Sequence, residues 1–465
     1  MSELPRGWTS TTLESLVAFD GLFSDGDWVE SKDQDPSGAI RLLQLADVGD
    51  GKFLDKSRRF LNDEQFERLR CTEVLAGDVL IARMPDPLGR ACVAPPLNQR
   101  CVTVVDVAIV RPGTASANPR WLMHFLNSQW IRQTIESEAS GTTRRRISRG
   151  KLAMLQLPLP PLPEQKRIAD KLDDLLARVD ACRERLDRVP AILKRFRQSV
   201  LAAATSGELT RDWRGGADVE LTEQNISQIC RTEKHSLAIG PFGSNLKVSD
   251  YREEGVPLVF VREIRTRSFG ATGTKYVSPE KAAELYAHTV QPGDLLITKM
   301  GDPPGDTAIY PMDRPPAVMT ADVVCMRVDP NIADSKFIGF AIESPLGRER
   351  IMEITAGVAQ QKISLERFRT MVLPLPSLAE QKEVTRRVSG LFDLADRMER
   401  LVNDAIQTND QCTPAILAKA FRGELVSQDP NDEPAAALLA RIAAQRDHAT
   451  PAARGRCKVA SGKRP

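Results

Sequence analysis

The stretch that decides the fold is Leu157–Lys166, L-P-L-P-P-L-P-E-Q-K, which returns 216 residues later as L-P-L-P-S-L-A-E-Q-K at Leu373–Lys382. The same spacing joins further landmarks of the two halves: Gly77-Asp78 with Gly293-Asp294, Asp106 with Asp322, Arg111 with Arg327, Gly141 with Gly357, Ser148 with Ser364, and Gly207-Glu208-Leu209 with Gly423-Glu424-Leu425. One constant spacing indicates a duplicated unit. The sequence therefore predicts an internal pseudo-two-fold repeat.

The front part of each copy, 1–157 and 213–373, has the pattern of a mixed α/β domain. Short β-branched runs such as Asp78–Ile81 and Val102–Val105 predict strands, separated by proline and glycine turns. Trp121–Ile135 and Phe337–Ile354 predict one helix in each copy. The fold class expected is α+β, with two tandem α/β domains.

The back part of each copy, 158–212 and 374–428, predicts a helix of about 40 residues with a heptad seam. The seam positions are Ile168, Leu172, Leu175, Val179, Cys182, Leu186, Val189, Leu193, Phe196 and Val200, then Val384, Val388, Leu391, Ala395, Met398, Val402, Ala405, Asn409, Cys412 and Ile416. This favours a coiled coil between the two helices, although each could instead pack on its own domain. Pro190 and Pro414 predict a kink or break in each helix.

Composition excludes several classes of protein. The 465 residues include 64 basic and 62 acidic side chains, so net charge points to no partner. No apolar run approaches the roughly 18 residues that span a bilayer. The eight cysteines contain no C-x-x-C pair, which argues against a zinc knuckle or a disulfide framework and places the chain in a reducing cytoplasm.

The duplicated order of α/β domain, P-L-P-x-x-E-Q stop, long helix and closing G-E-L resembles the DNA-specificity subunit of type I restriction–modification systems. The resemblance is carried by Leu157–Lys166, Ser199–Leu209, Leu373–Lys382 and Ala415–Leu425, and it covers about 1–428. It implies that 1–157 and 213–373 are target-recognition domains, each reading half of a bipartite site in double-stranded DNA. The antiparallel helices of 158–212 and 374–428 would set the spacer between the halves.

The resemblance also implies the partners. Two methyltransferase subunits would dock on the helices and bring S-adenosylmethionine, a motor-nuclease subunit would join them, and the chain itself would be non-catalytic with no cofactor or metal. A different class, a duplicated scaffold that binds proteins without reading bases, remains as the alternative. A self-sufficient methyltransferase is disfavoured, because Asp302-Pro303-Pro304-Gly305 has glycine where that chemistry needs an aromatic residue. No phosphate-binding G-x-x-x-x-G-K-[ST] loop or H-E-x-x-H zinc motif occurs either.

The strongest candidate for a DNA contact is the basic run Gly141–Lys151, which contains Arg144, Arg145, Arg146, Arg149 and Lys151. At the matching point of the second copy stand Gln360, Gln361 and Lys362. Arginine suits guanine and glutamine suits adenine in the major groove, so this exchange is expected of two domains with different specificity. The plain alternative is a solvated charge run.

Further cations complete the candidate DNA-binding set. Arg83 and Lys299 follow equivalent predicted strands and either meet phosphates or neutralise Asp86 and Asp302. Lys247, Arg262 and Arg265 form a basic group in the second copy only, because the first copy is acidic around Asp47–Asp50. His124, in an apolar helix, is predicted to be a packed core residue. The tail 429–465 holds a short helical candidate, 434–446, and is otherwise expected to be disordered.

Overall fold

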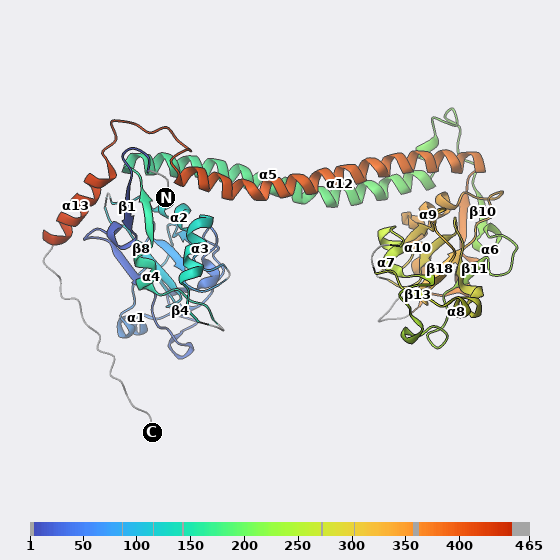
Figure 1. Cartoon of the computed structure of the whole chain (residues 1–465), viewed down its shortest axis with the longest axis horizontal. Coiled ribbons are helices and arrows are strands. Elements are labelled where there is room, and N and C mark those ends of the chain that lie inside the picture. The colour runs from blue at the N-terminus through green and yellow to red at the C-terminus, as the bar shows by residue number, and fades with distance from the viewer. Residues whose placement is uncertain are drawn as a thin grey trace, which may run out of the picture. The chain divides into compact units, whose positions relative to one another are not determined.

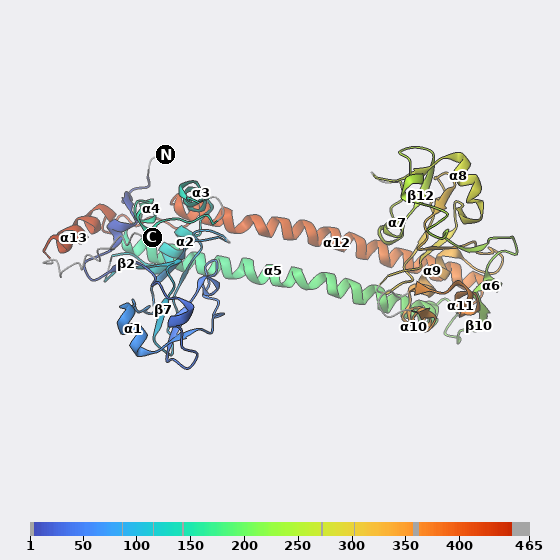
Figure 2. The same ribbon diagram turned by 90° about the horizontal axis from the view of Figure 1, so that it is seen from below.

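The computed structural model describes residues 4–85, 87–114, 116–141, 144–270, 273–301, 303–356 and 362–448. The chain divides into two compact units: unit 1 is Met1–Leu186 with Ala405–Pro465, and unit 2 is Asp187–Asp404. Both long helices pass from one unit into the other, α5 (Leu162–Thr205) and α12 (Leu378–Phe421), so each unit contains a recognition domain and part of each long helix (Figures 1 and 2). Among the described helices, none is long and apolar enough to cross a bilayer.

Unit 1 is built from short strands and helices around two small sheets. Its strands are β1 (Thr9–Thr12), β2 (Leu22–Asp25), β3 (Ile40–Leu43), β4 (Phe60–Leu61), β5 (Val79–Ala82), β6 (Ala91–Val93), β7 (Cys101–Thr103), β8 (Val107–Arg111) and β9 (Gln156–Leu159). Its short helices are α1 (Asp63–Leu69), α2 (Pro119–Leu126), α3 (Gln129–Glu138) and α4 (Arg149–Ala153). The strand orders are β2-β8-β5-β6 and β4-β3-β7, and β1 pairs with β9.

Unit 2 repeats this plan. Its strands are β10 (Thr222–Asn225), β11 (Leu237–Ile239), β12 (Val256–Val259), β13 (Tyr276–Val277), β14 (Thr289–Val290), β15 (Leu295–Thr298), β16 (Thr307–Ile309), β17 (Ala317–Met319), β18 (Val323–Met326), β19 (Thr355–Ala356), β20 (Lys362–Ile363) and β21 (Val372–Leu375). Its short helices are α6 (Ile226–Ile229), α7 (Val261–Thr266), α8 (Pro279–Glu284), α9 (Ser335–Glu343), α10 (Pro345–Glu353) and α11 (Leu365–Thr370). The order β11-β18-β15-β16 matches β2-β8-β5-β6, and β13-β12-β17 matches β4-β3-β7 with β14 added beyond β17, which confirms the repeat.

The predicted strands form, but each predicted long domain helix is two short ones. In the first copy the helix stops at Asn127, whose side chain accepts a hydrogen bond from the Ala91 amide and donates one to the Ala91 carbonyl, both at 2.9 Å. In the second copy Ser344 caps α10 through the Gly347 amide at 3.1 Å, and Pro345 occupies the first turn. Side chains with a strong local partner end the helix, although the apolar period continues through them.

The Glu-Gln pair of the duplicated motif fixes the elbow at which each long helix leaves its domain. The Gln165 side chain accepts a hydrogen bond from the Asn118 amide at 2.9 Å and donates one to the Pro160 carbonyl at 3.0 Å. Gln381 does the same with the Asp334 amide and the Pro376 carbonyl, both at 2.9 Å. Both glutamines are buried, so they satisfy backbone groups that would otherwise be costly to bury.

The long helices run antiparallel within each unit. In unit 2, Arg197 pairs with Glu399 at 2.9 Å, while Arg387, further back on α12, reaches the Leu209 carbonyl, also at 2.9 Å. In unit 1, Arg183 pairs with Asp410, and Leu417 packs in the same core as Leu172. Each domain core therefore includes the end of the other copy's long helix.

Neither proline breaks its helix. Both α5 and α12 are continuous 44-residue helices with Pro190 and Pro414 inside them, so the prediction of a break is wrong. Both prolines are exposed, so water can hydrate the carbonyls that lose their helical partners. The seam also differs at two positions: Cys182 is exposed, and Met398 is 44% exposed.

The tail is more ordered than the sequence suggested. Helix α13 (Ala435–His448) packs Leu438 and Ile442 against Ala18, and Arg167 of α5 pairs with Asp432 at 2.7 Å (Figure 1). The helix predicted at 434–446 is therefore confirmed, and the expected disorder is wrong for 429–433. The reason is that Leu438 and Ile442, four positions apart on one helix face, find a surface to cover. Residues 449–465 lie outside the described part of the chain.

Candidate DNA interface

The turn that joins the last two sheet strands holds the basic loop in unit 1. The Arg83 amide donates to the Asp106 carbonyl at 2.8 Å, and the Ile147 amide donates to the Arg83 carbonyl at 3.1 Å. These two bonds hold the middle of the basic run, at Ile147, beside the turn 104–106. In unit 2, the Lys299 amide meets the Asp322 carbonyl at 2.8 Å and the Ile363 amide meets the Lys299 carbonyl at 2.9 Å. Both copies therefore present their loop from the same backbone frame.

The basic loop of unit 1 is a narrow hairpin. Ser140 and Arg146 exchange two backbone hydrogen bonds of 3.0 and 2.8 Å, with Gly141 at φ +100°. Arg144 and Arg145 are exposed near the tip. Arg144 has no side-chain partner among the described residues, whereas Arg145 donates to the Glu136 carbonyl. Thr142 and Thr143 lie outside the described residues.

The other cations of this run differ in their exposure and in the partners that their side chains already have. Arg146 donates to the Val105 carbonyl at 3.1 Å and lies 3.3 Å from Asp106, so it ties the loop to the turn. Arg149 and Lys151 are exposed at the start of α4, where Lys151 reaches the Glu138 carbonyl at 2.6 Å. Arg149 also reaches the Phe23 carbonyl at 3.4 Å, and Lys151 lies 3.4 Å from the Glu138 carboxylate. Arg144, Arg145, Arg149 and Lys151 are therefore exposed, while Arg146 ties the loop to the turn.

Arg83 is not available at this surface. Its side chain is buried, pairs with Asp25 and donates to the Ile147 carbonyl at 2.9 Å and the Val105 carbonyl at 3.1 Å. Burial lowers the pKa of its guanidinium. The structure therefore contradicts a phosphate contact by Arg83, because the donors that would meet a phosphate hold the frame together. Its expected alternative partner, Asp86, lies outside the described residues.

In unit 2 the corresponding loop is described only in part. Lys362 is exposed on β20 and bridges to Met300, next to the half-buried Lys299. Gln360 and Gln361, the predicted counterparts of the arginines, lie outside the described residues. Lys299 and Lys362 are thus brought together by the same frame that holds the loop of unit 1.

The second basic group is only partly gathered. Arg265 on α7 reaches Asp306 at 3.1 Å, in the loop that follows Lys299. Arg262 lies over the Phe260 ring at 4.8 Å and donates to the Gly273 carbonyl at 2.9 Å. Lys247 is exposed and has no side-chain partner among the described residues. The structure places Arg265 near Lys299, and shows no contact that gathers Lys247 and Arg262 with them.

The acidity of the matching segment in the first copy has a structural cause. Asp47 is fully buried and accepts hydrogen bonds from the amides of Gln44, Lys56 and Ser57 at 2.7–2.8 Å, which hold its pKa below the usual range although burial opposes them. Glu263 takes the same place in unit 2 and accepts from the Phe260 amide at 2.8 Å. A buried carboxylate is therefore common to both copies.

Sequence reasoning missed a groove beside the basic loop. A cavity of about 630 Å³ opens in unit 1 against the turn 104–106. Its walls include Trp28, Gln34, Gln44, Arg59 and Asp106. No motif marks these residues, because they come from separate loops. The signal that could have found Trp28 is a glycine followed two residues later by an aromatic residue, which recurs at Gly240 and Phe242 with a spacing other than 216.

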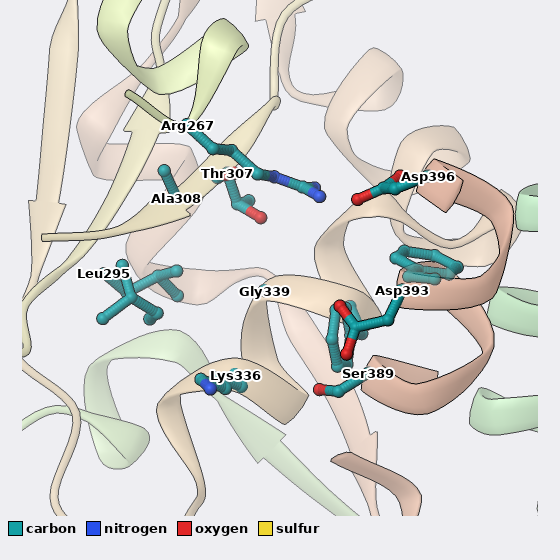
Figure 3. A pocket seen from close by; sticks show the side chains of 12 residues that line it. Arg267, Leu295, Thr307, Ala308, Lys336, Gly339, Ser389, Asp393 and Asp396 are labelled. Atoms are coloured by element: carbon teal, nitrogen blue, oxygen red, sulfur yellow. Dashed lines mark hydrogen bonds between the residues drawn. The ribbon is translucent and has the colours of Figure 1, made fainter. Parts of the chain in front are cut away.

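Unit 2 has a second cavity, of about 260 Å³, between the domain sheet and α12. Arg267, Lys336, Gly339, Ser389, Asp393 and Asp396 line it together with apolar side chains (Figure 3). Arg267 is already paired with Glu343 at 2.8 Å, and two carboxylates face the space. Two carboxylates and a neutralised arginine are unsuited to bind a phosphate. Because the lining residues come from both the domain and α12, we interpret the cavity as part of the joint between domain and helix.

No described group of histidine, cysteine or acidic residues in this structure has the arrangement of a metal site. Buried His124 donates to or accepts from Asp173 across 2.7 Å, as a packed core residue would, and burial lowers its pKa. The described cysteines are free, and burial raises the pKa values of the Cys71, Cys92 and Cys230 thiols to about 12.

Comparison with known proteins assigns the family. The profile described as "Type I restriction modification DNA specificity domain" matches residues 96–191 and 271–407, about half of the chain. The specificity subunit of the type I restriction enzyme EcoKI from Escherichia coli K12 is 32% identical over 350 residues, covering 70% of this chain and 71% of that protein. The EcoBI specificity subunit from Escherichia coli is 34% identical over 352 residues, covering 71% and 72%.

Solved structures share the fold. The HsdS subunit from Thermoanaerobacter tengcongensis superposes with a TM-score of 0.60 at 20% identity, covering 91% of this chain and 98% of that one. A chain from a structural study of assembly and conformational transition in a type I restriction–modification system gives 0.64 at 18% identity, covering 91% and 100%. The chain belongs to the family of DNA-specificity subunits of type I restriction–modification systems.

Proposed function

We propose that each unit reads one half of a bipartite DNA site and that the two half-sites differ. The observation that carries this proposal is the shared frame of turn and loop, on which unit 1 presents Arg144 and Arg145 and unit 2 presents Lys362. A common scaffold with different side chains suits two readers of different sequences. Gln360 and Gln361 extend this contrast in sequence, with adenine as their expected partner.

The DNA-contacting set that we propose is smaller than the sequence alone suggested. It keeps Arg144, Arg145, Arg149, Lys151, Lys247, Arg262, Arg265, Lys299, Gln360, Gln361 and Lys362. Arg83 is removed, and Arg146 becomes a positioning residue that also contributes positive charge. Exposed arginines and lysines neutralise phosphates, while the glutamines read base edges.

The antiparallel helices set the spacing between the half-sites and carry the docking surface for two methyltransferase subunits. An exposed apolar stripe on the unit 2 part of α12 supports this: Leu394 is 46% exposed, Met398 44% and Leu401 62%. On α5 in the same unit, Ile192 is 54% exposed and is level with Leu401 in the register that Arg197 fixes with Asp396. Exposed apolar side chains at helical spacing favour a protein partner.

The catalytic steps belong to these partners. The methyltransferase subunits bring S-adenosylmethionine for adenine methylation, and a motor-nuclease subunit adds restriction of unmethylated DNA. The chain supplies recognition in the cytoplasm, and no catalytic residue is assigned to it.

Methylation mapping tests the proposed reading directly. DNA from cells that express this chain with its methyltransferase partner should carry methyladenine in one asymmetric two-part motif with a gap of fixed length. A soluble complex that methylates no defined motif would contradict sequence reading and favour the protein-binding scaffold.

The basic loop can be tested by salt dependence. Arg144→Ala with Arg145→Ala should weaken DNA binding and reduce the slope of log affinity against log salt by about one per lost phosphate contact. Arg146 stays unchanged, because its bonds hold the turn. Arg441→Ala with Arg446→Ala, on α13 at the opposite end of β2, is the matched control and should leave the slope as it is. An unchanged slope in the loop variant would refute the phosphate contacts.

A further inference from the structure

The two recognition domains each carry one large aromatic side chain in the open at the same structural position. Trp28 is 67% exposed and Phe242 is 72% exposed. Each follows the first strand of a four-stranded sheet, β2 in unit 1 and β11 in unit 2. Two residues before each aromatic, a glycine amide binds the first residue of the last sheet strand: Gly26 to Val107 at 2.8 Å and Gly240 to Val323 at 2.9 Å.

Close packing fixes this position in both copies. A Cβ on Gly26 would lie 2.1 Å from the Val104 carbonyl oxygen, and a Cβ on Gly240 would lie 1.8 Å from that of Thr320. Real side chains essentially never approach backbone so closely, so only glycine lets the strand end press onto the turn. The chain then leaves the sheet at once, and the second residue after the glycine projects from the surface. An aromatic residue at this point in both copies is therefore a shared feature of the frame.

In unit 1 the exposed indole lies on the wall of the groove beside the basic loop. Trp28 shares that groove with Gln34, Gln44 and Arg59. Its Nε1 donates to Glu30 at 3.2 Å, which orients the ring. The same groove is lined by Val105 and Asp106, the residues to which Arg146 ties the basic loop. The ring, amide side chains and arginines thus meet at one concave surface.

In unit 2 the same turn gathers a similar set. Gly240 presses on the turn at Thr320, and the next residue but one of that turn, Asp322, binds the Lys299 amide at 2.8 Å. Lys362 follows on the strand that bridges to Met300. Beyond Phe242, the residues Ser244, Asn245 and Lys247 are exposed and polar. Phe242 is thus followed in the chain by exposed polar and cationic side chains, and its turn is the one that holds the Lys299 amide.

We propose that Trp28 and Phe242 are equivalent base-contacting residues, each placing its ring against the bases of the half-site that its own unit reads. The inference rests on the proposed function and adds a specificity residue to it. Aromatic rings stack on bases of any kind, because every base has a π-face, and apolar wedges in duplex DNA enter flexible base steps. Surrounding amides, arginines and carboxylates supply the polar contacts that a purely protein-binding aromatic patch does not require.

The test uses the full chain in complex with its methyltransferase partner, on the duplex that methylation mapping defines. Trp28→Ala and Phe242→Ala should each lower affinity about tenfold, and the conservative changes Trp28→Phe and Phe242→Trp should keep it within about threefold. In the wild-type complex, base substitutions in either half-site should lower DNA affinity. In Trp28→Ala, substitutions in the half-site read by unit 1 should lower it less, and in Phe242→Ala the same should hold for the half-site read by unit 2.

Matched controls come from each unit. Phe19, at the other end of β2, is 60% exposed, and Tyr286 in unit 2 is 61% exposed. Phe19→Ala and Tyr286→Ala should leave affinity unchanged. Complex assembly, measured by size, should be intact in all six variants. If Trp28→Ala and Phe242→Ala lose assembly and keep DNA affinity, the aromatics are protein contacts and the proposal is overturned.

Fluorescence gives an independent readout. Binding of the cognate duplex should quench tryptophan emission in the wild-type complex, and this quenching should be lost in Trp28→Phe. Equal quenching in both would overturn stacking by Trp28. A wild-type complex that binds no defined duplex would instead refute the proposed function, whereas full affinity in both alanine variants would refute this inference alone.

Discussion

The joints between domain and long helix differ in chemistry although their backbones match. In unit 1, Arg120 pairs with Asp170 and Asp173 at 2.5 Å, His124 meets Asp173 at 2.7 Å, and Met123 is buried. The residues at the same places in unit 2 are Lys336, Phe340, Ser389 and Gly339, and a cavity of about 260 Å³ opens there. There Phe340 packs edge-on against Phe392 at 5.7 Å. The same backbone joint is therefore compatible with an ion-pair network in unit 1 and with an aromatic contact beside a cavity in unit 2.

What both joints keep is the buried Glu-Gln elbow. The glutamines make identical bonds, but the glutamates do not. Glu380 pairs with Arg214, which also reaches the Gly207 carbonyl at 2.8 Å, whereas Glu164 accepts a hydrogen bond from the Trp8 indole at 3.1 Å. Burial raises the pKa of the Glu164 carboxyl. The glutamate therefore has a different partner in each copy, whereas the glutamine binds the same two backbone groups in both.

The largest difference should appear when each glutamate becomes glutamine. Glu380→Gln leaves Arg214, whose side chain is only 12% exposed, without its counter-charge and should destabilise unit 2 by about 3–5 kcal/mol. Glu164→Gln keeps an acceptor for Trp8 and should change unit 1 by less than about 1 kcal/mol. Hydrogen exchange resolved on peptides of each unit measures both. Equal losses would show that the two elbows have the same energetics.

Replacing the helix prolines should have a similar effect in both units. Pro190→Ala in unit 2 and Pro414→Ala in unit 1 each restore an amide donor in a continuous helix, and each should stabilise by about 1–3 kcal/mol. Thermal unfolding of the two variants measures this gain. A loss of stability would mean that the helices require the proline geometry, which would support a role in the spacer.

Acid should destabilise unit 1 more when His124 is present. Burial lowers the folded pKa of His124 below its usual value, so the unfolded chain binds more protons and stability falls as pH drops through that usual value of about 6.5. Asp173 and Arg120 face the ring; Asp173 opposes the lowering of the pKa and Arg120 adds to it.

The variant His124→Phe places in unit 1 the residue that unit 2 has at Phe340. It removes the contribution of His124 to the pH dependence of stability. Asp27, whose pKa burial raises to about 6, acts in the opposite direction in the same unit: its folded form takes up the proton first, so it favours folding as pH falls below about 6. Because Asp27 is unchanged in the variant, the difference between wild type and His124→Phe at pH 7.5 and 5.5 reports His124. An identical pH dependence in both would contradict a buried neutral imidazole.

The smallest effect is expected from rebuilding the first joint in the second. Lys336→Arg with Ser389→Asp recreates the Arg120–Asp173 pair at the rim of the cavity, where solvent screens it. A double-mutant cycle should give a coupling of about 0.2–1 kcal/mol. A coupling well above that range would show that the pair orders the joint in unit 1.

Local period and repetition in the sequence were enough to predict two copies, short strands, two long helices of about 40 residues, and a basic loop at one point of the repeat. The sequence did not reveal that Arg83 is buried. A cation after a strand has the same sequence pattern whether it is exposed or pairs with a distant carboxylate, and here the partner is Asp25, 58 positions away. Sequence reasoning also missed Trp28 and Phe242, since exposure of an aromatic depends on which segments pack beside it.

How each core is completed could be seen only in the folded chain. Phe421, at the end of the second helix, packs edge-on against Trp121 and Phe125 of the first domain at 6.3 and 5.2 Å, and Leu201 of the first helix lies in the core of unit 2. Heptad spacing predicts that an apolar face will be buried, but it does not specify the surface that buries it. That choice follows from the shapes of distant segments that meet only in the folded chain.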